Sequence, residues 1–273
     1  HHLSHMEYIV HYGYNKPGIV LVIDGSGSLD EDRLLLNIKE EHHSKIINYS
    51  YFSGKEVISA YWFDGSKSYL IYRFSPSRSV VDSCNSSSKG FLQSIGHYWD
   101  WASLYCCGSR GNAGKVMGLA AFGDNNNCGN DFLTITSQGE LKLDFLKINH
   151  EYQDANIFGV DLSNSKHHQN LAKRVQTETE TVILKLLDIL KKKFPCENLY
   201  LSGGVALNVV VNERIKKSNL FKKIILNGSV EDNGTAIGAC LAASLNIGLD
   251  RKFSDVIDYY GRQYSENDIL NHL

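Results

Sequence analysis

The sequence predicts an α/β fold, and three stretches carry that prediction. Leu199–Leu201 is an apolar run followed by Ser202-Gly203-Gly204 and then by a segment with helical apolar spacing. This order is typical of a strand, a glycine turn and a helix. Ile19–Ile23 is apolar without interruption, which indicates a central strand buried on both faces. His167–Phe194 carries the longest helical signal of the chain.

Shorter patterns predict the remaining elements. Alternating residues and turn signals after the first strand favour a β-meander, and helical spacing of aromatic or small residues favours further helices. The expected strands are Leu34–Ile38, Lys45–Phe52, Val57–Phe63, Ser68–Phe74, the hairpin Phe132–Ile135 with Glu140–Leu143, and Phe221–Leu226. The expected helices are Gly90–Tyr105, Gly114–Gly123 and Thr235–Leu245. At the polar start of the long helix, His167 and His168 are expected at the surface.

Composition narrows the class of protein. The 273 residues are 42% hydrophobic and 21% charged with a net charge of −2, which fits a globular protein without a global field for nucleic acid or an anionic membrane. The six cysteines form no CxxC motif, so a thiolate zinc site is not expected. Neither a membrane-length apolar run nor a signal peptide is visible. A cytoplasmic location is therefore expected.

The first five residues read HHLSH. His1 and His5 are spaced i, i+4, so a helix would place both imidazoles on one face, as a two-histidine metal site requires. His2 would point elsewhere. A tag or cloning remnant explains histidines at this place equally well. Spacing alone leaves the two explanations even.

Three further segments offer polar or approachable groups at strand ends. Asp24 opens a DGSG turn after the first strand, where a carboxylate can hold a metal, although an ordinary turn is about as common. The Gly203-Gly204 pair allows a ligand to approach the backbone, but taken alone is more often a tight turn. Asp232 follows a strand and precedes a helix, where ligands bind in α/β sheets and where capping charges also occur.

The motifs HHLSH, LVIDGSGS, GKVMGLAAFG, SGGVALN and EDNGTAIGAC occur in that order between His1 and about Asn246. Five motifs in fixed order resemble the O-carbamoyltransferases of antibiotic tailoring and nodulation-factor modification. Their transferase domain is related to the tRNA threonylcarbamoyl transferases. The resemblance implies a ribonuclease-H-like lobe of the actin/sugar-kinase/heat-shock ATPase type, and it makes a chance remnant at HHLSH improbable.

The resemblance also implies a set of site residues. The family binds a divalent metal, typically iron(II), through an H-x-x-x-H pair and an aspartate before the last helix, which would be His1, His5 and Asp232. The aspartate of the DGxG motif lies at the same site and would be Asp24. The SGGVALN motif would hold adenosine through Gly203, Gly204 and Asn208.

Family members use carbamoyl-adenylate, which a second domain makes from carbamoyl phosphate and ATP. The resemblance therefore implies that this chain passes a carbamoyl group to a hydroxyl of a small-molecule acceptor, with metal assistance, and that the adenylate-forming domain is a partner in cis or in trans. Asp24 would orient or deprotonate the acceptor hydroxyl. Neither a membrane nor a nucleic acid is expected as a partner.

Two departures from the family pattern set the expected domains. Most of the first lobe and the long adenylate-forming domain have no counterpart here, so the chain is expected to be a fragment or a reduced relative. Residues 1–16 would be a remnant of the truncated first lobe, residues 17–249 the second lobe with a helical insertion, and residues 250–273 a C-terminal extension. A tRNA threonylcarbamoyl transferase-like enzyme and a non-catalytic nucleotide-binding module remain as alternatives.

Overall fold

The computed structural model describes residues 1–13, 15–29, 47–50, 54–76, 93–124, 131–152, 165–251, 253 and 264–271. Within them the chain is a mixed α/β protein, as the sequence predicts. The described strands are β1 Gly18–Ile23, β2 Ile47–Ser50, β3 Ile58–Phe63, β4 Ser68–Ser75, β5 Leu133–Ile135, β6 Leu141–Leu143, β7 Asn198–Ser202 and β8 Lys223–Ile225. The described α-helices are α1 His2–His11, α4 Ile95–Cys107, α5 Ala113–Leu119, α6 Phe145–Glu151, α7 Ser165–Lys193, α8 Val209–Lys217, α9 Thr235–Asn246 and α10 Glu266–Leu270. Short 3₁₀ turns are η2 Ala120–Phe122, η4 Gly204–Leu207 and η5 Asp232–Gly234.

Strand β1 lies near the middle of a six-stranded mixed sheet with the order β2-β4-β3-β1-β7-β8. It pairs antiparallel with β3 and parallel with β7. All six of its residues are buried. Ile19, Leu21 and Ile23 join the hydrophobic cluster on one face, while Val20 and Val22 join the cluster on the other. The uninterrupted apolar run therefore marks a strand covered on both faces, as predicted.

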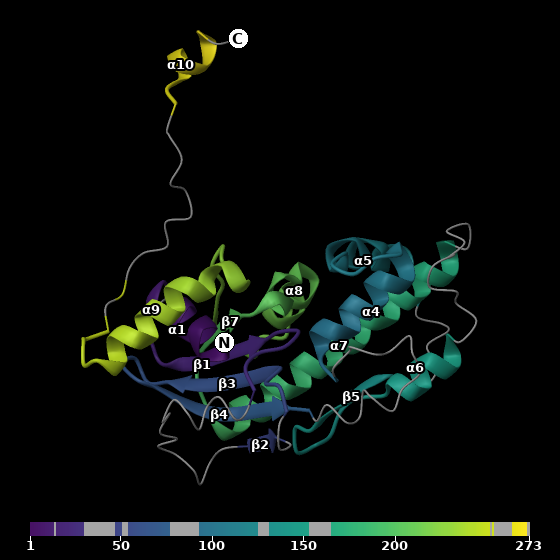
Figure 1. Cartoon of the computed structure of the whole chain (residues 1–273), viewed down its shortest axis with the longest axis horizontal. Helices are drawn as coiled ribbons and strands as arrows, with labels where there is room; N and C mark the ends of the chain where they lie inside the picture. The colour runs from purple at the N-terminus through teal and green to yellow at the C-terminus, as the bar shows by residue number, and fades with distance from the viewer. Residues whose placement is uncertain are drawn as a thin grey trace.

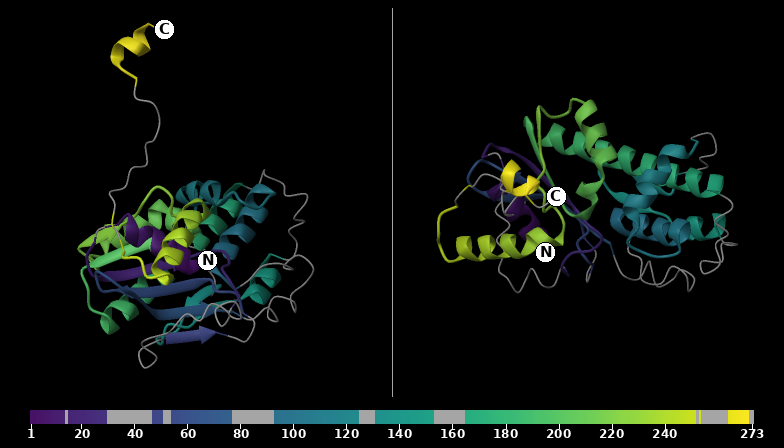
Figure 2. Two further views of the ribbon diagram at one scale, coloured as in Figure 1. Left: turned by 60° about the vertical axis from the view of Figure 1, so that its left-hand side comes forward. Right: turned by 90° about the horizontal axis from the view of Figure 1, so that it is seen from above.

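Helices cover both faces of this sheet. Helices α1 and α9 lie on one side (Figure 1). Seen from above, the sheet stands between this pair and the larger helical group that includes α4 and α7 (Figure 2, right). In the described part of the chain, no helix combines the length and the apolar character that a membrane crossing requires.

The predicted meander is only partly right. Strands β3 and β4 form the expected antiparallel hairpin, but β3 pairs directly with β1. Ile47–Ser50, within the strand expected at 45–52, pairs parallel with β4 at the edge of the sheet. The expected strand at 34–38 lies outside the described residues. The reason for the difference is burial: β3 is buried along almost its whole length and can flank the central strand, whereas a four-residue strand suits an edge.

Helix α1 is enclosed between the sheet and α9. Met6, Ile9 and Val10 pack with residues of the sheet, while the opposite side of α1 meets α9. The helices approach so closely that a Cβ at Gly238 would lie 1.8 Å from the carbonyl oxygen of Ser4. Gly238 is one of several small residues in α9, and the close contact with α1 occurs there.

Helix α4 begins at a polar cap and ends at a glycine. Ser94 is its N-cap and accepts a hydrogen bond from the His97 N–H, and Gly108 closes the helix at a φ of 73°. The expectation that His168 is a surface residue is wrong, because its side chain is buried with its ring 5.5 Å from that of Tyr105. Its neighbour His167 is exposed as expected. His168 lies three positions before Leu171, so the inward face of α7 begins about one turn earlier than the apolar pattern suggests.

Replacing Gly238 by Ala should destabilise the fold and disturb the α1–α9 contact. The added Cβ would overlap the Ser4 carbonyl, and overpacking typically costs about 1–3 kcal/mol in free energy of unfolding. Chemical denaturation monitored by circular dichroism measures the change. Gly118→Ala is the matched control, because a Cβ there would meet no described atom outside its own helix within 4 Å. This substitution should stabilise helix α5 by about 0.5–1 kcal/mol. Equal stability of the Gly238 variant and the wild type would contradict the packing described.

Candidate metal centre and adjoining cavity

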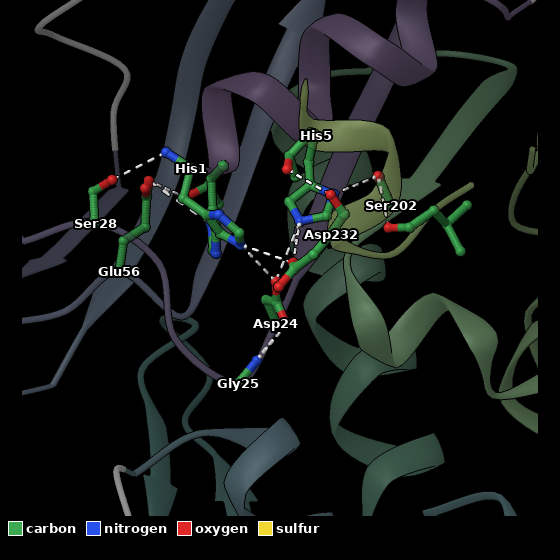
Figure 3. A network of polar contacts seen from close by, with 12 residues as sticks. His1, His5, Asp24, Gly25, Ser28, Glu56, Ser202 and Asp232 are labelled. Carbon is green, nitrogen blue, oxygen red and sulfur yellow. Dashed lines mark hydrogen bonds and ion pairs between the residues drawn. The ribbon is translucent and has the colours of Figure 1, made fainter. Parts of the chain in front are cut away.

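Four side chains predicted as metal ligands converge at one end of the sheet. His1 precedes α1 and His5 lies in it, Asp24 follows β1, and Asp232 lies in η5 before α9. One potential ligand atom from each lies within 4.8 Å of the others. Figure 3 shows the two imidazoles and the two carboxylates pointing toward a common point. Residues separated by more than two hundred positions in the sequence are thus brought together.

The distances between these groups are short. His1 Nε2 lies 2.9 Å from Asp24 Oδ2 and 3.3 Å from Asp232 Oδ1. His5 Nε2 lies 3.2 Å and 3.5 Å from the same two oxygens. The side chain of His5 is fully buried, whereas that of Asp232 is 76% exposed. The four-residue cluster is therefore buried on the side of His5 and open to solvent on the side of Asp232.

The arrangement shifts the ionisation of its members. Burial alone would raise the pKa of Asp24, but the neighbouring imidazoles of His1 and His5 and the Gly25 N–H outweigh it and hold this pKa well below its usual range. The hydrogen bond to Asp24 in turn raises the pKa of His1 against the effect of burial. Asp24 is accordingly an anion across the physiological pH range, as a ligand to a cation must be.

The donor set fits a divalent metal. His5 Nδ1 is 3.2 Å from the Ser202 hydroxyl, which orients the ring. His5 Nε2 is buried and makes no hydrogen bond within the described part of the chain, although two carboxylate oxygens face it. Two imidazole nitrogens and two carboxylate oxygens are ligands that iron(II), manganese(II) and zinc accept. That these residues bind a metal stays a prediction.

A cavity of about 380 Å³ begins at Asp24. One wall comes from the start of α4 and from α5, and the opposite wall comes from η4 and the start of α8. Its lining is mainly apolar, with Trp99, Met117, Val205 and Leu207 among the contributors. An apolar cavity that ends at a cluster of polar ligands suits a planar organic group with a charged or polar end.

The two glycines of the SGGVALN motif have different tasks. Gly203 has a φ of +90°, and a Cβ there would lie 2.3 Å from the Ile23 carbonyl oxygen, so the turn itself requires glycine. Gly204 lines the cavity, and among the described residues a Cβ there would meet only Asp24 Oδ1, at 3.4 Å. The predicted close approach of a ligand to the backbone therefore concerns Gly204 first.

Asn208 also lines the cavity, but its amide already has internal partners. Its Oδ1 accepts a hydrogen bond from the Val211 N–H and caps α8, while its Nδ2 donates to Gln176 Oε1 at 3.0 Å. These bonds hold the N-terminus of α8 in place beside Gly204. Ligand binding by Asn208 stays a prediction, and the bonds that the structure describes give it a role in shaping the turn.

The wall contributed by α4 was not predicted from the sequence. His97 and Asp100 line the cavity from this helix, and burial lowers the pKa of His97. The helix can reach the site because position 96 is a glycine. A Cβ there would lie only 2.6 Å from the Gly25 Cα. Ser94 Oγ also donates a hydrogen bond to the Gly25 carbonyl oxygen. The Ser-Ile-Gly sequence before His97 was the available signal, because glycine in a helix start often marks a close approach.

Residues 1–241 match the family described as Carbamoyltransferase N-terminus. The chain belongs to this carbamoyltransferase family. An uncharacterised protein of Methanocaldococcus jannaschii is 25% identical over 100% of this chain and 42% of its own length. An uncharacterised protein of Synechocystis is 30% identical over 56% of the chain and 27% of its own length. Nodulation protein NolNO of Sinorhizobium fredii is 25% identical over 49% of the chain and 20% of its own length.

The chain thus spans less than half the length of these curated relatives. Among solved structures, HypF from T. kodakarensis is similar in fold, with a TM-score of 0.52 and 14% sequence identity. The likeness covers 90% of this chain and 36% of that one. The family resemblance stated from the five sequence motifs is confirmed by the family match.

Replacing Asp24 by Asn should weaken divalent-metal binding more than about 100-fold. Loss of a residue that only hydrogen-bonds to a metal ligand already lowers metal affinity by about 10–100-fold. The substitution keeps the shape of the side chain but removes the charge that the two imidazoles face. Isothermal titration with Mn²⁺ measures the change. Asp64→Asn is the matched control, because Asp64 bonds only within its own turn and with Tyr69 in the described structure. Unchanged affinity in the Asp24 variant would exclude it as a ligand.

Proposed function

We propose that this chain carries out the transfer step of an O-carbamoyltransferase. It would move the carbamoyl group of carbamoyl-adenylate to a hydroxyl of a small-molecule acceptor, with a divalent metal, iron(II) foremost, at the four-residue centre. A carbamoyl-adenylate-forming domain, in cis or in trans, would supply the donor. The observation that carries the proposal is the meeting of His1, His5, Asp24 and Asp232 at the mouth of a cavity bordered by Gly204.

The sheet topology supports this proposal. Strands β4, β3 and β1 are successive antiparallel neighbours, and β7 and β8 continue the sheet parallel to β1. We infer a ribonuclease-H-like lobe of the actin/sugar-kinase type from this order. Asp24 and Gly203 follow the carboxyl ends of the adjacent parallel strands β1 and β7. Open α/β sheets bind ligands at such ends.

The cavity and the four-residue centre would bind different parts of the donor. The apolar cavity would take the adenine and ribose of the donor against Gly204, with the phosphate toward Asp24. His1, His5, Asp24 and Asp232 would hold the metal, which supplies positive charge for the carbonyl oxygen and the leaving phosphate. The apolar lining contributed by Trp99, Met117 and Leu207 would keep water from the reactive donor.

The transfer itself makes one bond and breaks one. The acceptor oxygen bonds to the carbamoyl carbon, the bond from that carbon to the phosphate oxygen breaks, AMP leaves with the electron pair, and the hydroxyl proton passes to solvent. A carboxylate whose pKa is held low is a weak base. Asp24 therefore suits orientation of the reacting groups and charge balance better than proton removal, which refines the role expected from the sequence.

Replacing Asp232 by Ala should abolish carbamoyl transfer and leave folding intact. Its side chain is 76% exposed, so its loss removes a ligand but little core packing, and functional groups commonly add little to stability. AMP release from carbamoyl-adenylate in the presence of hydroxyl acceptors measures the activity, and thermal unfolding measures the stability. Glu231→Ala, at the exposed neighbouring position, is the control and should retain activity. Transfer at the wild-type rate by the Asp232 variant would refute the proposed centre.

Replacing Gly204 by Val should weaken adenylate binding by about 2 kcal/mol or more, near 30-fold in Kd, if overpacking magnitudes apply. The branched side chain would fill the part of the cavity beside Asp24. Calorimetric titration with AMP gives the affinity. Gly204→Ala serves as the graded control, since its single Cβ would sit at 3.4 Å from the nearest described atom. An unchanged AMP affinity in the Val variant would remove the nucleotide from this cavity.

A further inference from the structure

His2 lies beside the predicted ligand His1 but belongs to a different contact network. Its side chain is fully buried and does not take part in the four-residue centre. Nδ1 of His2 is 2.9 Å from the Ser59 hydroxyl, on β3. That hydroxyl in turn makes a short hydrogen bond to Glu56, whose side chain is also buried. A fully buried line of polar groups thus runs from α1 into the sheet.

The direction of these hydrogen bonds follows from the single proton of the serine hydroxyl. Ser59 Oγ donates to the Glu56 carboxylate, which has no proton of its own to give when ionised. Ser59 Oγ must therefore accept from His2, so the proton lies on His2 Nδ1. His2 acts as a donor that fastens α1 to β3.

The segment that receives this bond also holds the turn that carries Asp24. The Asp24 N–H donates to the Val57 carbonyl oxygen at 3.0 Å, and the Glu56 N–H donates to the Ser28 carbonyl oxygen at 3.0 Å. The Gly27 N–H donates to the Glu56 carbonyl oxygen. In addition, the His2 ring lies against the turn, because a Cβ at Gly27 would be 2.9 Å from His2 Cδ2.

We propose that His2 is a positioning residue for the metal centre. It would lock the start of α1, at which His1 and His5 lie, to the turn that presents Asp24. The inference rests on the proposed metal site. In the sequence H-H-x-x-H, the outer histidines face the ligand point and the inner one is turned about 100° around the helix. Loss of the His2–Ser59 bond would let the helix and the turn move relative to each other, and metal affinity depends on such pre-organisation.

The test measures Co²⁺ binding to the full chain, because Co²⁺ reports both affinity and ligand geometry through its visible absorption. We expect His2→Leu to raise the Kd for Co²⁺ by about 10–100-fold and to change the spectrum. His2→Asn places an amide N–H near the position of Nδ1 and should recover most of the affinity. His11→Leu, at the other end of the same helix, is the matched control and should bind Co²⁺ as the wild type does.

The outcomes separate the inference from the function on which it rests. Wild-type affinity in His2→Leu, or no recovery in His2→Asn, would overturn the positioning role while leaving the metal centre in place. A wild-type chain that binds no Co²⁺ would overturn both. If His2→Leu does not fold, Ser59→Ala removes the same hydrogen bond from the other side. Weaker Co²⁺ binding by Ser59→Ala, with its fold retained, supports the inference, and unchanged binding contradicts it.

Discussion

The candidate centre depends on the close contact between α1 and α9. His1 and His5 belong to the segment of the first helix, and Asp232 lies immediately before the last long one. Helix α9 reaches the backbone of Ser4 only because position 238 is a glycine. Ser4 lies between the two histidines and directly precedes His5. A backbone-to-backbone contact is stiffer than one between long side chains. The distance between the histidine pair and Asp232 is therefore set by packing rather than by the polar groups themselves.

The charges of the groups that this packing brings together also favour a cation between them. Two carboxylates are held within reach of each other, which costs free energy unless positive charge lies between them. His1 offsets part of the repulsion between the carboxylates through its hydrogen bond with Asp24. His5 contributes a buried nitrogen without a hydrogen bond in the described residues. The pair of carboxylates and this nitrogen match the pattern expected of a preformed cation site, which supports the proposed metal centre.

The sequence predicted local features well and non-local ones poorly. The apolar run of β1, the glycine turn at Gly203 and the i, i+4 histidine spacing are each contained in a few neighbouring residues. The edge position of β2 and the burial of His168 depend on partners far along the chain, so no local pattern states them. The sequence before His97 offers a local signal in Gly96, but the residue that Gly96 packs against, Gly25, lies far away in the chain, so the cavity wall with His97 was not predicted. The bond of Asn208 to Gln176 likewise joins residues 32 positions apart, so no local pattern indicates it.

Asp24 belongs both to the four-residue centre and to the lining of the cavity. One of its oxygens accepts the Gly25 N–H at 2.7 Å, and the other faces the imidazoles. The first of these oxygens is also the nearest atom to a Cβ at Gly204. A ligand that lies against Gly204 would therefore approach the carboxylate that the proposed cation would also engage. The proposed binding in the cavity and the proposed binding at the centre would share this one carboxylate, so each should alter the affinity of the other, as linkage requires.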